Sequence, residues 1–326
     1  MHGASWAWYI WRPALSGLHN HSALDTLETH PNMIKKIVEK ACSGGAAISG
    51  DSADYHNLSA ELARGNMYYE AIRVLDKGLS LFPNDTDLLS DMIEYATKNS
   101  QYQKAEQAID TLTGIHRRLW TWRCYEFTID YYRAIGDLEK AYQLSQDFIA
   151  SLPYDEHGYR SKAEIEMLLT PGDEGVTKAI ATLTNALNKR INAAQCARFL
   201  AEIYLDKGDY QSAIEASNRA ILESAQSQPH IGIASIIAQR GFAYDRLFME
   251  RMFNGDVQTE IAQKACEDFQ MAIAFVQKQY GVLSPITIKQ VIIRLNILAQ
   301  YIPNKADDDE EARDNHSSEN VKTIVN

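Results

Sequence analysis

A regular period of roughly 35 residues is the feature of this sequence that most restricts its fold. One short motif with a central alanine recurs along the chain at nearly constant spacing, with its alanines at Ala71, Ala105, Ala141, Ala179 and Ala213. Such a period is typical of arrays in which each repeat packs only against its neighbours. A chain of 326 residues could also form two average domains, so the period, and not the length, favours an array.

Each copy of the repeat predicts two antiparallel amphipathic helices. Around Ala213, apolar residues follow helical spacing over 197–204 and again over 213–221, with a turn at 207–210 between them. Small residues are needed where two helices cross closely, because a larger side chain would overpack the crossing at about 1 to 3 kcal/mol. The sequence therefore predicts an all-α chain of helical hairpins.

The copies also carry most of a known motif. The first copy contains Tyr55, Leu58, Leu62, Ala71, Gly78 and Pro83, and the third contains Tyr125, Ile129, Tyr132, Ala141, Phe148 and Pro153. This pattern resembles the tetratricopeptide-repeat family, although the family's Trp is missing and its Gly is variable. The resemblance spans roughly residues 52 to 275. It implies a right-handed α-solenoid of about five to six hairpins.

We expect four parts in the chain: an N-terminal helical or irregular cap at 1–50, the repeat array at 51–275, a C-terminal closing helix at 276–303 and an acidic disordered tail at 304–326. The closing helix begins at Pro285 and has a broad apolar face. The tail is too hydrophilic to pack. In the cap, Trp6, Trp8 and Trp11 either cover the first repeat or anchor a partner.

Two copies depart from the pattern. The fourth has Glu166 at a normally apolar position, which blurs the end of its first helix. The sixth has about a dozen extra residues between its helices, and we expect 253–257 to form a long loop or to lengthen both helices.

Charge and cysteine usage exclude several classes of protein. The net charge is −11 and Lys and Arg are scattered, so we expect no nucleic-acid partner. The four cysteines show no metal-ligand spacing, and no apolar stretch reaches membrane-spanning length. We expect a cytoplasmic protein with no membrane partner, no metal and no cofactor.

Two arrangements could indicate chemistry. His2-Gly3 followed by Cys42 near Gly44 is similar to the dyad of caspase-like cysteine peptidases, in which His2 would be the base and Cys42 the nucleophile. No strand can precede His2, however, and residues 37–40 favour a helix. The group of His19, His21, Asp25 and His30 matches no ligand pattern and is expected to be a polar loop.

The family resemblance implies a concave groove lined by the first helix of each repeat, and we predict that this groove binds a protein or peptide. Its predicted binding residues are Glu94, Arg123, Glu126, Asp130, Arg133, Glu164, Arg198, Glu202, Asp245 and Arg246, with His56, Arg64, Lys98 and Asp206 on the same face. Two strips stand out, one acidic at 94–164 and one mixed at 198–246. Where some relatives bind chaperone carboxylates, this chain has His56, Ala60, Asp87 and Asp91, which disfavours that role.

The sequence therefore predicts a non-catalytic binding scaffold or adaptor. A regulator that changes curvature on binding a peptide is a second possibility. A remnant of a cysteine peptidase at the N-terminus is the third.

Overall fold

The computed structural model describes residues 31–43, 51–189, 193–226, 232–278 and 282–302. The Trp-rich start and the acidic tail lie outside these residues. Contacts divide the chain into two compact units, residues 1–179 and 180–326, and each is described by itself. Residues 51–275, which we predicted to form the array, contribute to both units.

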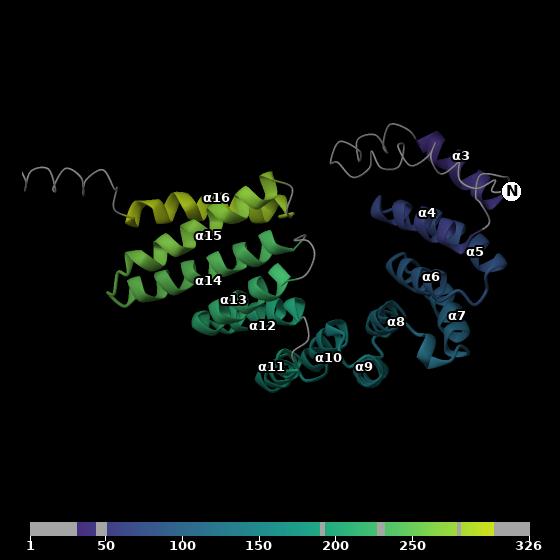
Figure 1. Cartoon of the computed structure of the whole chain (residues 1–326), viewed down its shortest axis with the longest axis horizontal. Helices are drawn as coiled ribbons and strands as arrows, with labels where there is room; N and C mark the ends of the chain where they lie inside the picture. The colour runs from purple at the N-terminus through teal and green to yellow at the C-terminus, as the bar shows by residue number, and fades with distance from the viewer. Residues whose placement is uncertain (1–30, 44–50, 190–192, 227–231, 279–281, 303–326) are drawn as a thin grey trace, which may run out of the picture. The chain divides into compact units, whose positions relative to one another are not determined.

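Unit 1 is a succession of helical hairpins. Its helices are α3 (Pro31–Cys42), α4 (Ser52–Arg64), α5 (Tyr68–Leu81), α6 (Thr86–Lys98), α7 (Tyr102–Thr113), the short 3-10 helix η2 (Arg117–Leu119), α8 (Trp122–Ala134), α9 (Leu138–Ser151), α10 (Glu156–Leu169) and the start of α11 (Asp173–Asn188). The pairs α4–α5, α6–α7 and α8–α9 each pack as antiparallel neighbours (Figure 1). The first helices α4, α6, α8 and α10 contact one another in that order, so they form one continuous face.

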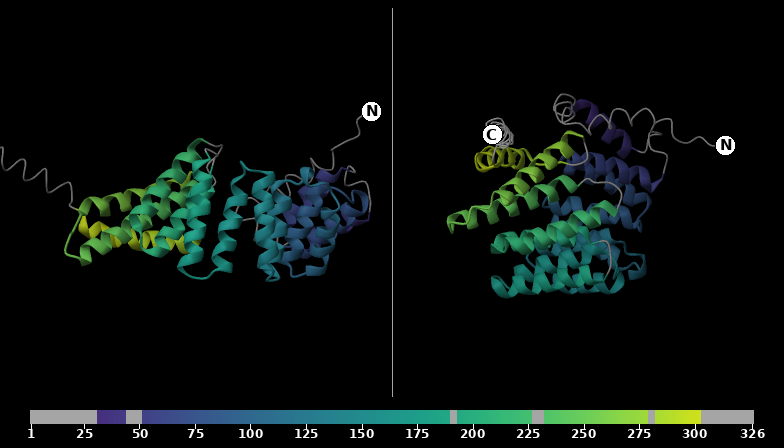
Figure 2. Two further views of the ribbon diagram at one scale, coloured as in Figure 1. Left: turned by 90° about the horizontal axis from the view of Figure 1, so that it is seen from below. Right: turned by 60° about the vertical axis from the view of Figure 1, so that its left-hand side comes forward.

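Unit 2 follows the same plan. Its helices are α12 (Ala194–Lys207), α13 (Tyr210–Gln226), α14 (Ile233–Phe253), α15 (Thr259–Gln277), α16 (Pro285–Leu298) and the 3-10 helix η3 (Ala299–Tyr301). Of these, α13, α14 and α15 are longer than the helices of the hairpins in unit 1. The extra residues of the sixth copy lengthen both α14 and α15, which was one of the two expected outcomes. The green-to-yellow helices of this unit lie one against the next (Figure 2), and α16 packs on α15 and α14.

Local sequence sets where these helices begin and turn. Asp51, Asp85 and Asp155 each accept a backbone N–H in the first turn of the helix that follows. The hairpin turns contain residues with positive φ, at Asn66 (58°), Ser100 (58°), Gly136 (81°) and Gly208 (76°). Asn tolerates this left-handed conformation better than most residues. The left-handed position of the turn is therefore occupied by Asn or Ser in the first two hairpins and by Gly in the turns at 136 and 208.

The repeated alanines lie in the core. The motif alanines at 71, 105, 141, 179 and 213 are all fully buried. Helices approach so closely that a Cβ added to Gly78 on α5 would lie 2.9 Å from Tyr55 Cβ on α4. In α14, a Cβ on Gly241 would lie 2.8 Å from the Phe269 ring. Small residues therefore set the spacing of the hairpins, as the sequence predicted.

The fourth copy, which departs from the motif at Glu166, still forms its first helix, α10. Glu166 is buried, but it forms an ion pair with Lys162 one turn earlier at 3.2 Å. The cation neutralises the carboxylate and allows it to occupy a core position. Every regular element in the described residues is a helix, and the prediction of an all-α solenoid is confirmed.

We expect Gly78→Val to lower the free energy of unfolding by about 1 to 3 kcal/mol, because the new methyl groups would overlap the Tyr55 side chain. Urea unfolding followed by circular dichroism measures the change. Ser80→Val on the exposed side of the same helix is the matched control and should change it by less than about 0.5 kcal/mol. An equal effect of both substitutions would show that helix propensity, and not close packing, limits residue 78.

Candidate functional site

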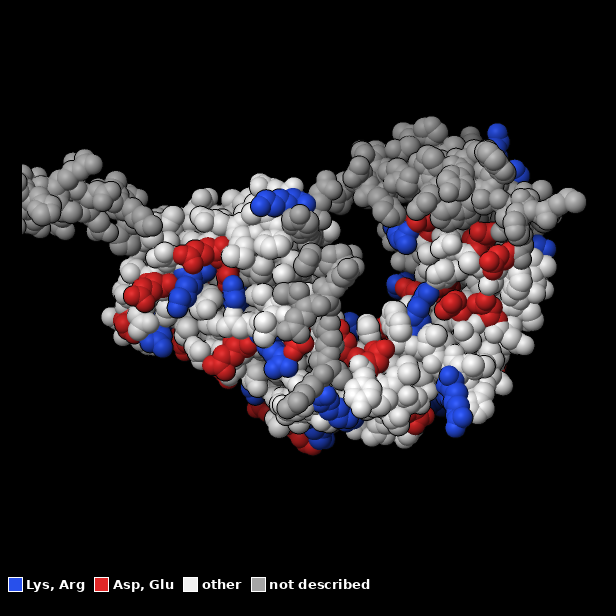
Figure 3. Space-filling model, viewed as in Figure 1, with Lys and Arg blue, Asp and Glu red and all other residues white. Residues whose placement is uncertain are grey.

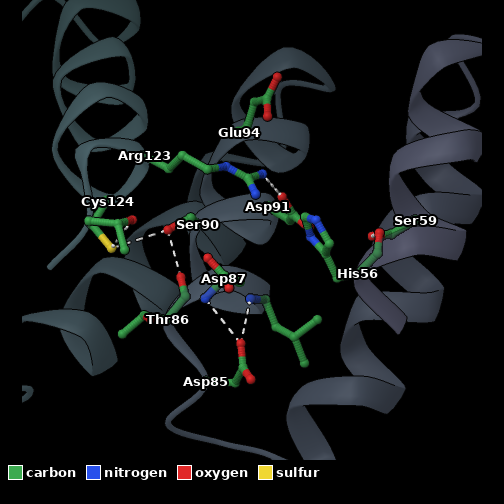
Figure 4. A network of polar contacts seen from close by, with 12 residues as sticks. His56, Ser59, Asp85, Thr86, Asp87, Ser90, Asp91, Glu94, Arg123 and Cys124 are labelled. Atoms are coloured by element: carbon green, nitrogen blue, oxygen red, sulfur yellow. Dashed lines mark hydrogen bonds and ion pairs between the residues drawn. The ribbon is translucent and has the colours of Figure 1, made fainter. Parts of the chain in front are cut away.

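The first helices of unit 1 are joined by a buried carboxylate. Asp91 on α6 is 0 % exposed, and it accepts from His56 Nδ1 on α4 at 2.5 Å and from an Arg123 guanidinium nitrogen on α8. Figure 4 shows the three side chains meeting between the helices, while Glu94 points away from them. One residue from each of three successive repeats therefore contributes to a single ion cluster.

The cluster satisfies a charge that would otherwise be costly. A carboxylate buried without partners loses its hydration, and breaking such a pair is strongly destabilising. The hydrogen bond to Asp91 raises the pKa of His56 above its ordinary value. The imidazolium form is thus favoured, so Asp91 has a structural role in addition to its place on the groove face.

A second set of ion pairs joins α8 to α10. Glu126 pairs with Arg160, and Arg133 Nη1 lies 2.8 Å from Glu164 Oε2 and 3.0 Å from Asp130 Oδ1. Burial raises the pKa of Glu126, while the Arg160 guanidinium opposes this effect. These carboxylates are therefore already matched by cations of the protein itself.

The predicted acidic strip of unit 1 is consequently an ion-paired surface. Its remaining member, Glu94, pairs with Lys98 at 2.5 Å on the same helix. Arg160 is not among the predicted binding residues, although it stands one repeat after its partner Glu126. Asp91 likewise stands one repeat after its partner His56 and was predicted only to disfavour a chaperone site. Pairing opposite charges at one-repeat spacing would have identified both contacts.

An aromatic pair lies at the N-terminal ends of α8 and α10. The Trp122 and His157 rings stack with centroids 4.5 Å apart and planes 18° from parallel. His157 Nδ1 lies 2.8 Å from Asp155 Oδ1, and this hydrogen bond raises the pKa of His157. Trp122 remains 37 % exposed, so part of its ring is available to solvent.

Unit 2 has a hollow between α12, α14 and the segment that leads into α16. Its volume is about 430 Å³, and its wall and floor are formed by Arg198, Glu202, Leu205, Asp206, Ser235, Ala238, Gln239, Phe242, Val282, Leu283, Ser284 and Thr287. We call it the unit 2 hollow. Three of the residues that we placed on the groove face, Arg198, Glu202 and Asp206, line it together.

The charges of the unit 2 hollow are only partly matched. Arg198 Nη1 pairs with Glu202 one turn along α12, and Arg198 Nε donates to Gln195 Oε1 at 3.0 Å. Gln239 Nε2 donates to the Arg198 carbonyl at 3.2 Å, which holds α14 against α12. Among the described residues, Asp206 has no ion-pair partner within 4.0 Å. The hollow therefore carries one carboxylate that a bound cation could neutralise.

The last two predicted binding residues have different environments. Asp245 is buried, and both of its oxygens accept from Arg294 on α16, at 2.6 and 2.8 Å. Its carboxylate fixes α16 to α14. Arg246 is exposed and does not line the unit 2 hollow. That either residue binds a partner stays a prediction.

Of the residues considered for catalysis or metal binding, Cys42 lies in the described part of the chain. Cys42 lies at the end of α3, and its Sγ donates to the Arg73 carbonyl at 3.6 Å. Burial raises the pKa of this thiol, whereas a nucleophilic cysteine needs a lowered pKa. His2, His19, His21, Asp25 and His30 lie outside the described residues.

Asp91→Asn should lower the pKa of His56, because the substitution removes the negative charge that favours the imidazolium. It should also lower the free energy of unfolding by about 1 to 3 kcal/mol, the range for a buried polar group that loses its partner. The raised pKa of His56 stabilises the fold fully below its unfolded value of about 6.5, and this contribution is lost as pH rises through the folded pKa.

Proton NMR titration of His56, with urea unfolding at several pH values, checks both effects. Asp147→Asn, at an exposed position on α9, is the control and should leave them unchanged. A His56 pKa that is the same in the wild type and in Asp91→Asn would contradict the contact.

No helix among the described residues is long and apolar enough to cross a membrane. No protein-family model and no curated protein matches the chain. Several solved structures are similar to the chain in fold. The human IFIT1 dimer with PPP-AAAA is similar with a TM-score of 0.51 at 16% identity, over 83% of this chain and 58% of that chain.

Two further solved structures are also similar. A tetratricopeptide repeat protein from Parabacteroides merdae gives a TM-score of 0.49 at 13% identity, over 89% of this chain and 99% of that chain. PilW, a type IV pilus biogenesis factor, gives 0.49 at 14% identity, over 74% of this chain and 98% of that chain. Identities this low inform the fold alone. The described residues form stacked helical hairpins, which is the fold that the resemblance to tetratricopeptide repeats implies.

Proposed function

We propose that this chain is a non-catalytic scaffold that binds a protein partner, and that the unit 2 hollow receives a peptide segment in which an apolar side chain stands next to Lys or Arg. The observation that carries the proposal is one hollow with an apolar floor and an unpaired carboxylate, Asp206, on its wall.

The floor of the hollow suits an apolar side chain. Ala238 and Leu283 are buried in the core of unit 2, and Phe242 packs edge-on against Phe269 with centroids 4.9 Å apart. These residues are held by the core, so the floor exists before a ligand arrives. A volume of about 430 Å³ lies within the range of small binding sites.

The wall of the unit 2 hollow favours a ligand with a positive charge. Arg198 is neutralised by Glu202, which leaves Asp206 as the charge that a ligand can pair with. An exposed ion pair contributes only about 0.2 to 1 kcal/mol, whereas burying a Leu-sized side chain contributes about 1.5 to 3 kcal/mol. The apolar side chain would therefore supply most of the affinity. The basic residue would supply selectivity.

The groove face of unit 1 suits this role less well. Its carboxylates and guanidinium groups already pair with one another, so a charged ligand would have to break existing contacts. Acidic and basic side chains are also interspersed on the described surface in the view of Figure 3, with no extended strip of one sign. The net charge of −11 opposes binding of a phosphate backbone. A peptide is the ligand that these charges favour.

Selection from a random library of short peptides tests the proposal. Against the wild-type chain we expect enrichment of an apolar residue next to Lys or Arg. Asp206→Lys should abolish this enrichment or shift it toward Asp and Glu, because the charge at the wall is reversed. Lys near the C-terminus of α12 interacts favourably with the helix dipole, so the variant should fold.

Glu250→Lys, at an exposed position on α14 away from the hollow, is the charge-matched control and should select the same peptides as the wild type. If Asp206→Lys also selected the same peptides, the hollow would not be the binding site. If the wild type selected none, the peptide-binding function itself would be refuted.

A further inference from the structure

Helix α16 is apolar on two opposite sides. Val291 and Leu298, seven residues apart, are buried against the rest of unit 2. Ile286 and Ile293, seven residues apart, form a second stripe on the side of the helix that faces away from this core, with the half-buried Ile297 at its margin. An amphipathic helix at the edge of a domain needs only the first stripe.

The second stripe is open in the described structure. Ile286 is 71 % exposed and Ile293 is 47 % exposed, as is Ile292 beside them. Figure 1 shows α16 at the edge of unit 2, with α15 and α14 on its other side. Single exposed apolar residues are ordinary. Ile286, Ile292 and Ile293, however, are exposed together on one helix and form an apolar patch, and such patches mark interaction sites.

The position of α16 in the repeat indicates what covers the patch. In each complete hairpin of unit 2, the first helix is packed by its own second helix, α12 by α13 and α14 by α15. The helix α16 stands where a first helix would, and no described helix packs on the outer stripe. The stripe is therefore shaped for one more helix.

The charged residues of α16 indicate which kind of helix could pack on the stripe. Residues 282–302 contain two charged side chains, Lys289 and Arg294, and no carboxylate. Arg294 is held by Asp245. Lys289 is exposed and stands beside the stripe, one turn from both Ile286 and Ile293. A second copy of α16 would bring one Lys289 near another, whereas a carboxylate on a partner helix would neutralise it.

We propose that the outer stripe of α16 binds an amphipathic helix of a partner protein that carries Asp or Glu beside its own apolar stripe. The contact completes the hairpin that α16 begins, with Lys289 pairing with the partner's carboxylate. The stripe and Asp206 are separate features, so the two sites can be tested independently.

The test uses two synthetic helical peptides of about 18 residues, roughly five turns, with one leucine stripe flanked either by Glu or by Lys. Fluorescence anisotropy with the full chain should show the Glu-flanked peptide binding about tenfold more tightly. The double variant Ile286→Gln and Ile293→Gln should lose about tenfold in affinity for it. Lys289→Glu should reverse the preference between the two peptides.

These substitutions lie on the exposed side of α16, so circular dichroism should show an unchanged fold. Ile135→Gln, at an exposed position in unit 1, is the control and should bind as the wild type does. Equal binding of both peptides, or full binding by the double variant, would overturn the proposal. A dimer in light scattering that the double variant abolishes would also overturn it, because the occupant would then be a second copy.

Discussion

The close crossing of helices within each hairpin is the constraint on which the structure depends. Ala71, Ala105 and Ala141 are fully buried at one-repeat spacing, and the space beside Gly78 is too small for a Cβ without movement of Tyr55. Packing at this density fixes the distance between helices, because a larger side chain could be accommodated only by strain. Once that distance is fixed, each residue on a first helix of unit 1 has a fixed position relative to its counterpart one repeat away in that unit.

The ion cluster at Asp91 follows from this geometry. A side chain on α6 has neighbours about one repeat away on α4 and α8, and here those neighbours are His56 and Arg123. The same relation brings Arg160 to Glu126. Charges that could have faced a partner instead stabilise the stack of first helices in unit 1. Asp206 in unit 2 has no such neighbour among the described residues, and this difference is why the proposed peptide site is placed there.

The sequence predicted the fold better than the site, and the reason is physical. The period, the buried alanines and the apolar stripes are local signals, so helices such as α12 and α14 could be inferred from spacing alone. The environment of a groove residue depends on which side chain stands opposite it. The register alone placed Asp245 on the groove face, and it could not show that α16 brings Arg294 against it from 49 residues away. Glu166 looked out of place until Lys162 was seen to neutralise it.

The two sides of α16 illustrate how one helix can serve both packing and binding. Its inner side supplies Val291 and Leu298 to the core, and Arg294 fixes it to α14, while the residues that lead into it close the unit 2 hollow. These inner contacts hold the helix in place. The apolar residues of the outer stripe therefore add no stability to the described fold. Exposed isoleucines lower solubility and contribute no stability. Their presence in a position that packing does not require is best explained by a partner that covers them, and the inner contacts hold the helix in place for that partner.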